Sequence, residues 1–97
     1  MNIVKKEDCT IISLEGRLDT LTAPELAEAV KTLAFEELIV ELKDLEYISS
    51  AGLRALLVCK KTADQKKASF VVKNPVPAVF EVMRMSGFDK VLDIRRD

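Results

Sequence analysis

Two adjacent serines, Ser49 and Ser50, lie where a strand-like segment gives way to a helix-like segment whose first turn contains Gly52. The first backbone N–H groups of a helix have no partner within it, and the helix dipole places positive charge at that end. A serine there can cap the helix, which is worth about 1 kcal/mol, or it can accept a phosphate. A phosphate on Ser50 would add about −1.5 to −2 charges at pH 7 and so change the surface that a partner meets.

A second pair of polar residues, Asp19 and Thr20, follows an earlier strand-like run. The carboxyl ends of parallel strands meet at one edge of an α/β sheet, and that edge carries the functional groups. We therefore predict that Asp19, Thr20, Ser49 and Ser50 form one small polar surface site. Side chains of Asp19 and Ser50 on opposite faces of the domain would contradict this. Asp19 could instead simply end its strand or cap the following turn.

The residues that an enzyme of a familiar class needs are missing. The chain has no histidine, so a Ser-His-Asp triad is impossible and the commonest general base is lacking. Its three glycines are Gly16, Gly52 and Gly87, and they form no phosphate-binding loop. No metal-ligand cluster occurs either. A lysine acting as a base keeps a minor enzymatic alternative open, but we expect a non-enzymatic binding protein without catalytic residues, cofactor or metal.

Composition predicts one domain over residues 1–97, because the chain is short and 48% hydrophobic. A net charge of −1 argues against nucleic acid as a partner. The charge is uneven: residues 1–53 carry 5 basic and 11 acidic groups, and residues 54–97 carry 10 basic and 5 acidic groups. This asymmetry indicates either an electrically polarised surface or two unrelated solvated faces.

The cellular setting is predicted from cysteine usage and hydropathy. Cys9 and Cys59 lack the paired spacing of zinc or redox sites and are expected to be buried thiols. The N-terminus shows no signal-peptide core, and no apolar run approaches the roughly 20 residues that span a bilayer. We therefore expect a cytoplasmic protein without a membrane partner.

Hydrophobic periodicity in the N-terminal half predicts a hairpin, a helix and a central strand. The hairpin strands are Asn2–Lys5 and Cys9–Glu15, joined by a polar turn. The helix begins at Thr22, where Glu25 is spaced to complete a capping box. The nearly continuous apolar run Leu38–Leu42 is typical of a parallel strand in the middle of a sheet, covered on both faces.

In the C-terminal half, the helix that follows the two serines is expected to turn one apolar stripe inward, made of Gly52, Leu56, Cys59 and Ala63. A strand over residues 68–72 comes next, then a helix opened by Asn74–Pro77 and ended by Gly87, then a short strand over residues 91–94. The order is β-β-α-β-α-β-α-β. It predicts an α/β sandwich with a mixed, mostly parallel sheet, since strands separated by helices pair in parallel through right-handed crossovers.

Three segments give the chain a resemblance to the STAS domain of bacterial anti-sigma-factor antagonists over nearly its full length. They are Gly16–Asp19, the more specific Asp44–Leu57, and Met85–Phe88. In that family the serine two positions before the helix glycine is phosphorylated by a partner that is both serine kinase and anti-sigma factor, and Ser50 holds that position here. The resemblance implies that the unphosphorylated form binds the kinase and frees a sigma factor. It also implies that the phosphorylated form lets go and that a serine phosphatase resets the switch.

The resemblance also implies a partner surface. The family's acidic residue on the kinase-facing surface corresponds to Asp19. Many phosphorylated members carry an aspartate before the serine and a hydroxyl residue after it, where this chain has Ser49 and Ala51. Ser50 is the expected site of phosphorylation, and Ser49 is the less favoured second candidate. The residues that we expect to bind the partner are Asp19, Thr20, Ser49, Ser50, Gly52, Leu53, Arg54, Leu57 and Val58.

Several of these residues have a structural alternative. Arg54 follows Ser50 by one helical turn and is predicted to pair with a phosphate on it. Gly52 could serve close approach of two elements rather than binding, and Leu57 and Val58 could belong to the core. The alternative function is a phosphorylation-independent STAS scaffold subunit of a transporter or signalling assembly, which docks a partner through the same helix surface.

Overall fold

The computed structural model describes residues 1–97 and shows the predicted order of elements. Its strands are β1 (Asn2–Lys6), β2 (Cys9–Leu18), β3 (Glu37–Ile48), β4 (Ser69–Lys73) and β5 (Ile94–Arg95). Its helices are α1 (Ala23–Thr32), α2 (Ser50–Gln65) and α3 (Pro77–Met85), followed by a single 3-10 turn, η1 (Phe88–Lys90). The α/β fold with a mixed sheet is confirmed.

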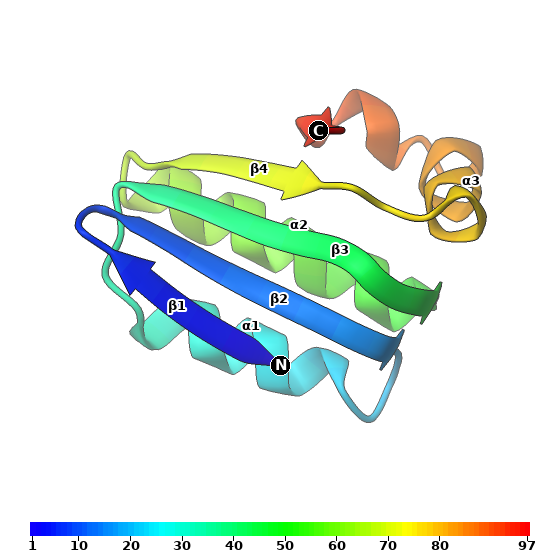
Figure 1. The fold of residues 1–97 in the computed structure, drawn as a ribbon, viewed down its shortest axis with the longest axis horizontal. Coiled ribbons are helices and arrows are strands. Elements are labelled where there is room, and N and C mark those ends of the chain that lie inside the picture. The colour runs from blue at the N-terminus through cyan, green and yellow to red at the C-terminus, as the bar shows by residue number, and fades with distance from the viewer.

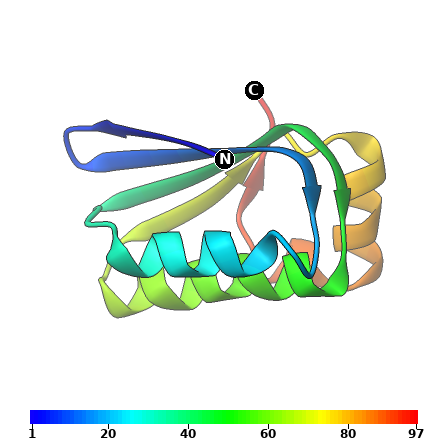
Figure 2. The same cartoon turned by 90° about the horizontal axis from the view of Figure 1, so that it is seen from below.

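The five strands lie in the sheet in the order in which they occur along the chain. The β1–β2 hairpin is antiparallel, as predicted, and all other neighbours are parallel. Because each crossover is right-handed and steps in the same direction, α1 and α2 lie side by side on one face of the sheet (Figure 1). The other face stays free of helices (Figure 2).

The strand β3 occupies the middle of the sheet, as predicted, but the expectation that both of its faces are covered is wrong. Leu38, Val40 and Leu42 point into the helix-covered core and are fully buried. Ile39 alternates to the open face and is only half-buried. Crossovers that all step in one direction leave that face without a helix.

The core lies between the sheet and the two helices. The predicted inward stripe of α2 is buried there, including Leu56 and Cys59, and α1 contributes Leu26 and Val30. Burial raises the pKa of the Cys59 thiol to about 12, so it stays protonated and unreactive at neutral pH. None of the helices has the length and hydropathy needed to cross a bilayer.

The strands β2 and β3 run further than the sequence pattern predicted, and both turn toward the helix layer near their C-terminal ends (Figure 2). Their pairing shifts between Ser13 and Glu15 and again between Gly16 and Arg17, where Gly16 adopts a φ of 70°. Such irregularities bend a strand pair and increase its twist. The bend brings the ends of both strands to the starts of α1 and α2.

The C-terminal region follows the prediction with one change of length. Gly87, with a φ of 78°, follows the last residues of α3 as expected. The last strand, predicted over residues 91–94, is shorter and begins only at Ile94, because Val91 caps η1 and Leu92 is buried in the core.

Candidate functional site

The ends of β2 and β3 are joined by hydrogen bonds at the point where the polar residues occur. Leu18 pairs with Ile48 in the sheet, and the Ser49 N–H donates to the Leu18 carbonyl over 3.0 Å. Asp19 and Ser49 therefore follow directly from two neighbouring strand ends. The arrangement that would have contradicted a shared site, with Asp19 and Ser50 on opposite faces, is not found.

The two serines have different structural roles. Ser49 is the N-cap of α2, and its Oγ accepts the Gly52 N–H over 3.3 Å. The Ser49 side chain is half-buried and also reaches the Leu18 carbonyl, at 3.5 Å. Ser50 is the first residue of the helix and is exposed. The capping bond therefore belongs to Ser49, and the hydroxyl of Ser50 is left at the surface.

The start of α2 has a positive electrostatic environment that favours an anion. Its first turn carries no acidic residue, so the positive end of the helix dipole is not offset by a side chain. Arg54 is exposed one turn further along. A negative group on Ser50 would meet both.

Gly52 is held against the end of β2. A Cβ added at this position would lie 2.4 Å from the Leu18 carbonyl oxygen and 2.7 Å from Ile48 Cγ1. Neither distance is compatible with a real side chain, and the nearer atom is backbone that cannot move aside. Gly52 is buried, so its role is the close approach of α2 to the strand ends rather than contact with a partner.

Asp19 organises the turn between β2 and α1. Its Oδ1 accepts the N–H of Leu21 at 3.1 Å and that of Thr22 at 3.4 Å, and Arg17 Nε donates to its Oδ2 at 3.2 Å. Partial burial alone would raise the pKa of Asp19, but these hydrogen bonds outweigh it and hold the pKa below its usual range. Asp19 is thus a fixed negative charge, and it caps the turn as the structural alternative foresaw.

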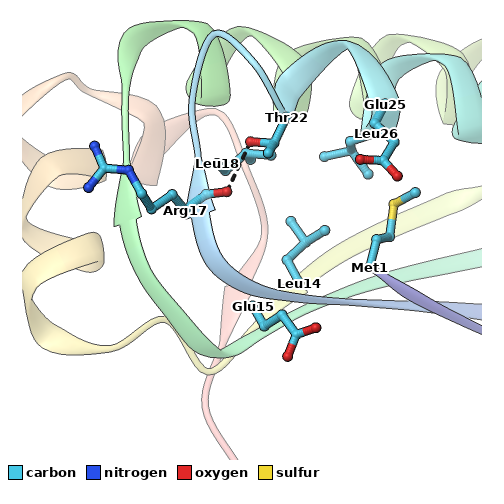
Figure 3. Close-up of a pocket in the computed structure, with 8 residues that line it drawn as sticks. All are labelled: Met1, Leu14, Glu15, Arg17, Leu18, Thr22, Glu25 and Leu26. Atoms are coloured by element: carbon cyan, nitrogen blue, oxygen red, sulfur yellow. Dashed lines mark hydrogen bonds between the residues drawn. The ribbon is translucent and has the colours of Figure 1, made fainter.

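The capping box predicted at Thr22 is wrong. Thr22 has a helical backbone conformation and makes no side-chain cap bond. Its hydroxyl instead donates to the Arg17 carbonyl at 2.9 Å and accepts the Asp19 N–H at 2.9 Å. Figure 3 shows this bond from Thr22 to the end of β2, with the Arg17 side chain directed away from the small hollow beside Leu14. Because β2 bends here, the Arg17 carbonyl lies within reach of the Thr22 hydroxyl, which bonds to it and not to the first N–H groups of α1.

Arg17 and Tyr47 form a contact that the sequence analysis missed. The guanidinium of Arg17 lies 4.2 Å from the centre of the Tyr47 ring, a cation–π arrangement. The two residues are paired across β2 and β3 only because the register shifts just before Arg17. Both lie within the motifs that carried the family resemblance, which was the available signal.

The other residues that were predicted to bind a partner differ in their exposure to solvent. Thr20 and Arg54 are exposed, and together with the half-buried Val58 they border a groove of about 290 Å³ between α1 and α2. Leu57 is half-buried on α2. Leu53 is only 5% exposed and belongs to the core, so its side chain is not available to a partner.

Leu21 is a surface residue that the sequence analysis did not consider. Its side chain is 88% exposed in the turn beside Asp19. No three His, Cys, Asp or Glu side chains gather where they could hold a metal ion. The site therefore offers a fixed carboxylate, a free hydroxyl at a helix start, a cation and an apolar groove, which together suit protein recognition.

Comparison with protein families matches residues 1–94 to the family described as "Mlab, STAS domain". The chain belongs to the STAS domain family. The resemblance stated from the sequence is confirmed.

Relatives of this STAS domain carry names of one kind. The anti-sigma F factor antagonist of Paenibacillus polymyxa is 31% identical over 88 residues, which cover 87% of this chain and 75% of that protein. The anti-sigma-B factor antagonist of Listeria monocytogenes is 26% identical over 103 residues, covering 98% of this chain and 90% of that protein.

Among solved structures, unphosphorylated SpoIIAA, an anti-sigma factor antagonist, matches this STAS domain with a TM-score of 0.87. The match has 19% identity and covers 99% of this chain and 86% of that one. At this level of identity the likeness shows the fold alone. It agrees with the sheet order and the helix placement described above.

Proposed function

We propose that this STAS domain is an anti-sigma factor antagonist. In this proposal it is a non-enzymatic cytoplasmic regulator that binds a serine kinase/anti-sigma factor and is switched by reversible phosphorylation of Ser50. The observation that carries the proposal is the separation of roles between the two serines. Ser49 holds the helix cap, so Ser50 can be modified without loss of the bond that starts α2. The names of the relatives support the same role.

The phosphate would arrive by transfer from ATP. The Ser50 Oγ attacks the γ-phosphorus, the bond from that phosphorus to the β–γ bridging oxygen breaks, and ADP leaves. The kinase supplies the base that takes the hydroxyl proton, since this chain contains no histidine to do so. Ser50 is exposed and at the surface, as such a transfer requires.

The phosphate changes the charge at one point of the surface, and the domain need not refold. The unphosphorylated surface presents Asp19, Thr20 and Arg54 around a neutral Ser50. A phosphate there adds roughly two negative charges near the fixed charge of Asp19. We expect Arg54 to turn toward the phosphate across one helical turn. The kinase then loses both the neutral hydroxyl and the free cation and dissociates, and a phosphatase restores the first state.

The proposal is tested by incubating the protein with ATP and each candidate serine kinase of its source genome, and mapping the phosphate by mass spectrometry. Ser50→Ala should abolish modification, and Ser49→Ala is the matched control that should retain it. Absence of phosphate with every kinase would favour the scaffold alternative. Phosphate on Ser49 alone would keep a switch but reject Ser50 as its site.

The role of Arg54 is tested separately with phosphorylated protein. Arg54→Ala should lower the stability of the phosphorylated form in urea unfolding and leave that of the unphosphorylated form nearly unchanged, and Lys90→Ala, at an exposed position away from the site, serves as the control. Equal losses of stability in the phosphorylated and unphosphorylated Arg54→Ala variants would reject the pairing.

A further inference from the structure

The groove beside Ser50 continues along the whole interface between α1 and α2. Its first part, about 290 Å³, is floored by small apolar side chains. These include Pro24 and Ala27 of α1 and Ala51, Ala55 and Val58 of α2. A second hollow of about 430 Å³ begins at the same Val58 and lies toward the end of α2. Since Val58 lines both, the two hollows adjoin along the helices, and we call this shallow depression the α1–α2 groove.

The second part of the α1–α2 groove is basic. It is lined by Lys31 of α1 and by Lys61 and Lys66 at the end of α2, and Arg54 stands on the border of the first part. No carboxylate lines either part. The nearby Asp64 is paired with Lys60 at 3.4 Å. Four cations without a lining anion contrast with the net charge of −1 of the whole chain.

The dimensions of the α1–α2 groove fit a peptide segment. From Ala51 to Lys66 the helix rises about 22 Å, at about 1.5 Å per residue, which is the length of about four turns of a second helix. The small side chains of the floor leave room for bulky apolar groups. Amphipathic helices bind grooves of this kind through apolar side chains spaced three and four residues apart.

We propose that the α1–α2 groove binds an acidic amphipathic helix of a partner protein. Apolar side chains of that helix fill the alanine-lined part beside Ser50, and its carboxylates lie over Lys31, Lys61 and Lys66. This inference rests on the proposed function in one respect: the groove begins at Ala51, the residue after Ser50. A phosphate on Ser50 would pair with Arg54 and place a solvated negative charge beside the alanine-lined part, which disfavours apolar side chains of the segment there.

An anionic membrane is the competing occupant, because it too would attract the lysines. A bilayer presents its anionic groups in one plane with its apolar chains below them, whereas a helix can set apolar and acidic side chains next to each other, as the two parts of the α1–α2 groove require. This arrangement favours the segment, and the test includes vesicles as a separate arm.

The test uses the full unphosphorylated chain and a fluorescein-labelled designed helix of about 16 residues, the length of the groove. Leucines occupy the binding face of one half of this peptide, and glutamates occupy the same face of the other half. Anisotropy titration should show binding that weakens at about 0.15 M salt, where the screening length is about 8 Å. A peptide of the same composition in scrambled order should bind at least about tenfold more weakly.

Three variants locate the binding. The triple variant Lys31→Glu, Lys61→Glu and Lys66→Glu should lose at least about tenfold in affinity. A matched triple variant at exposed lysines elsewhere, Lys5→Glu, Lys43→Glu and Lys90→Glu, changes the net charge equally and should bind as the parent does. Ala27→Leu, which fills the apolar part, should weaken binding without loss of the fold.

Equal losses in the two triple variants would overturn the inference, because binding would then follow net charge alone. So would equal affinity for the scrambled peptide. Binding to phosphatidylglycerol vesicles that depends on the groove lysines as strongly as peptide binding does would also overturn it, in favour of a membrane.

The outcome is independent of the kinase experiment. If no kinase modifies Ser50 but the peptide binds with the predicted lysine dependence, the switch fails and the groove stands. If Ser50 is phosphorylated but the peptide ignores the lysines, the groove fails and the switch stands. If both hold, phosphorylated protein should bind the peptide several-fold more weakly than unphosphorylated protein.

Discussion

The chain passes from strand to helix twice at the same edge of the sheet, and the two junctions are held in different ways. Between β2 and α1, side chains hold the turn: the Asp19 carboxylate and the Thr22 hydroxyl form hydrogen bonds with backbone groups of the turn and of β2. Between β3 and α2, the backbone itself is packed against β2, with Gly52 beneath the Leu18 carbonyl and Ser49 as the cap.

The difference shows which structural condition leaves a serine hydroxyl exposed and without a structural role. The first junction uses its polar side chains to hold its own shape, so they are not free for chemistry. The second is held by backbone contact and by one serine, so the next serine is left exposed. Gly52 and the Ser49 cap hold the start of α2 without the Ser50 side chain, so the phosphorylation proposed for Ser50 would leave these contacts intact.

Among substitutions at the two junctions, the largest loss of stability is expected at Gly52. Gly52→Ala should destabilise the protein by about 2–4 kcal/mol, because its Cβ would overlap backbone of the neighbouring strand. Urea unfolding followed by circular dichroism measures this. Gly87→Ala, where a Cβ meets no atom within 4 Å and only the φ of 78° opposes it, measures the cost of backbone strain alone. A Gly52→Ala variant as stable as the parent would contradict the overlap.

The first junction should depend on the Thr22 hydroxyl. Thr22→Val keeps the shape but leaves the Arg17 carbonyl and the Asp19 N–H without their partner, which should cost about 1–2 kcal/mol. Hydrogen exchange of the Asp19 amide should speed up in this variant while that of Ser49 does not. Thr32→Val, at the exposed end of α1, is the control; the same loss at both sites would argue against a special role for Thr22.

The two serines should separate in stability measurements. Ser49→Ala removes the cap and should cost about 1 kcal/mol, whereas Ser50→Ala should stay within about 0.5 kcal/mol of the parent. Thermal unfolding of the two variants under identical conditions measures the difference. A larger loss for Ser50→Ala would reverse the assignment of the cap.

The smallest effect is expected from acid titration of the first junction. Because hydrogen bonds lower the pKa of Asp19 in the folded state, the stability it contributes is complete above the unfolded pKa, about 3.9. That stability is lost as the pH falls through the folded pKa. Asp19→Asn should therefore show a shallower loss of stability below about pH 5 than the parent in urea unfolding. Asp44→Asn, at an exposed position of β3, is the control, and a parallel decline in parent and Asp19→Asn would contradict the prediction.

The sequence predicted the types and order of the elements because their apolar spacing differs between strand and helix. It also predicted that Asp19 and Ser50 share an edge, since topology alone places strand ends together. Gly52 was predicted to bind the partner, with close approach of two elements as the alternative, and its burial against Leu18 agrees with the alternative. These features depend on local pattern and on connectivity, which the sequence carries directly.

What the sequence could not predict depends on contacts between distant residues. The capping box at Thr22 has the right local spacing, but a carbonyl of the bent strand takes the hydroxyl instead. The pairing of Arg17 with Tyr47 follows from a register shift that leaves no local mark. The burial of Leu53 and the open face at Ile39 likewise depend on how the helices are placed over the sheet.

The strands β2 and β3 bend together near their C-terminal ends, so a change in the length of one strand there must be matched by a change in the other. Side chains alternate between the faces of a strand, so loss of one residue between Ser13 and Leu18 would reverse the faces beyond it and draw the Leu18 carbonyl away from Ser49. Only a compensating change in β3 would bring them back together. Insertions and deletions in this region should therefore be tolerated in matched pairs or not at all. A change of length at the Glu7–Asp8 turn would instead act at the opposite end of these strands, where the Asp8 carbonyl accepts the Glu36 and Glu37 N–H groups.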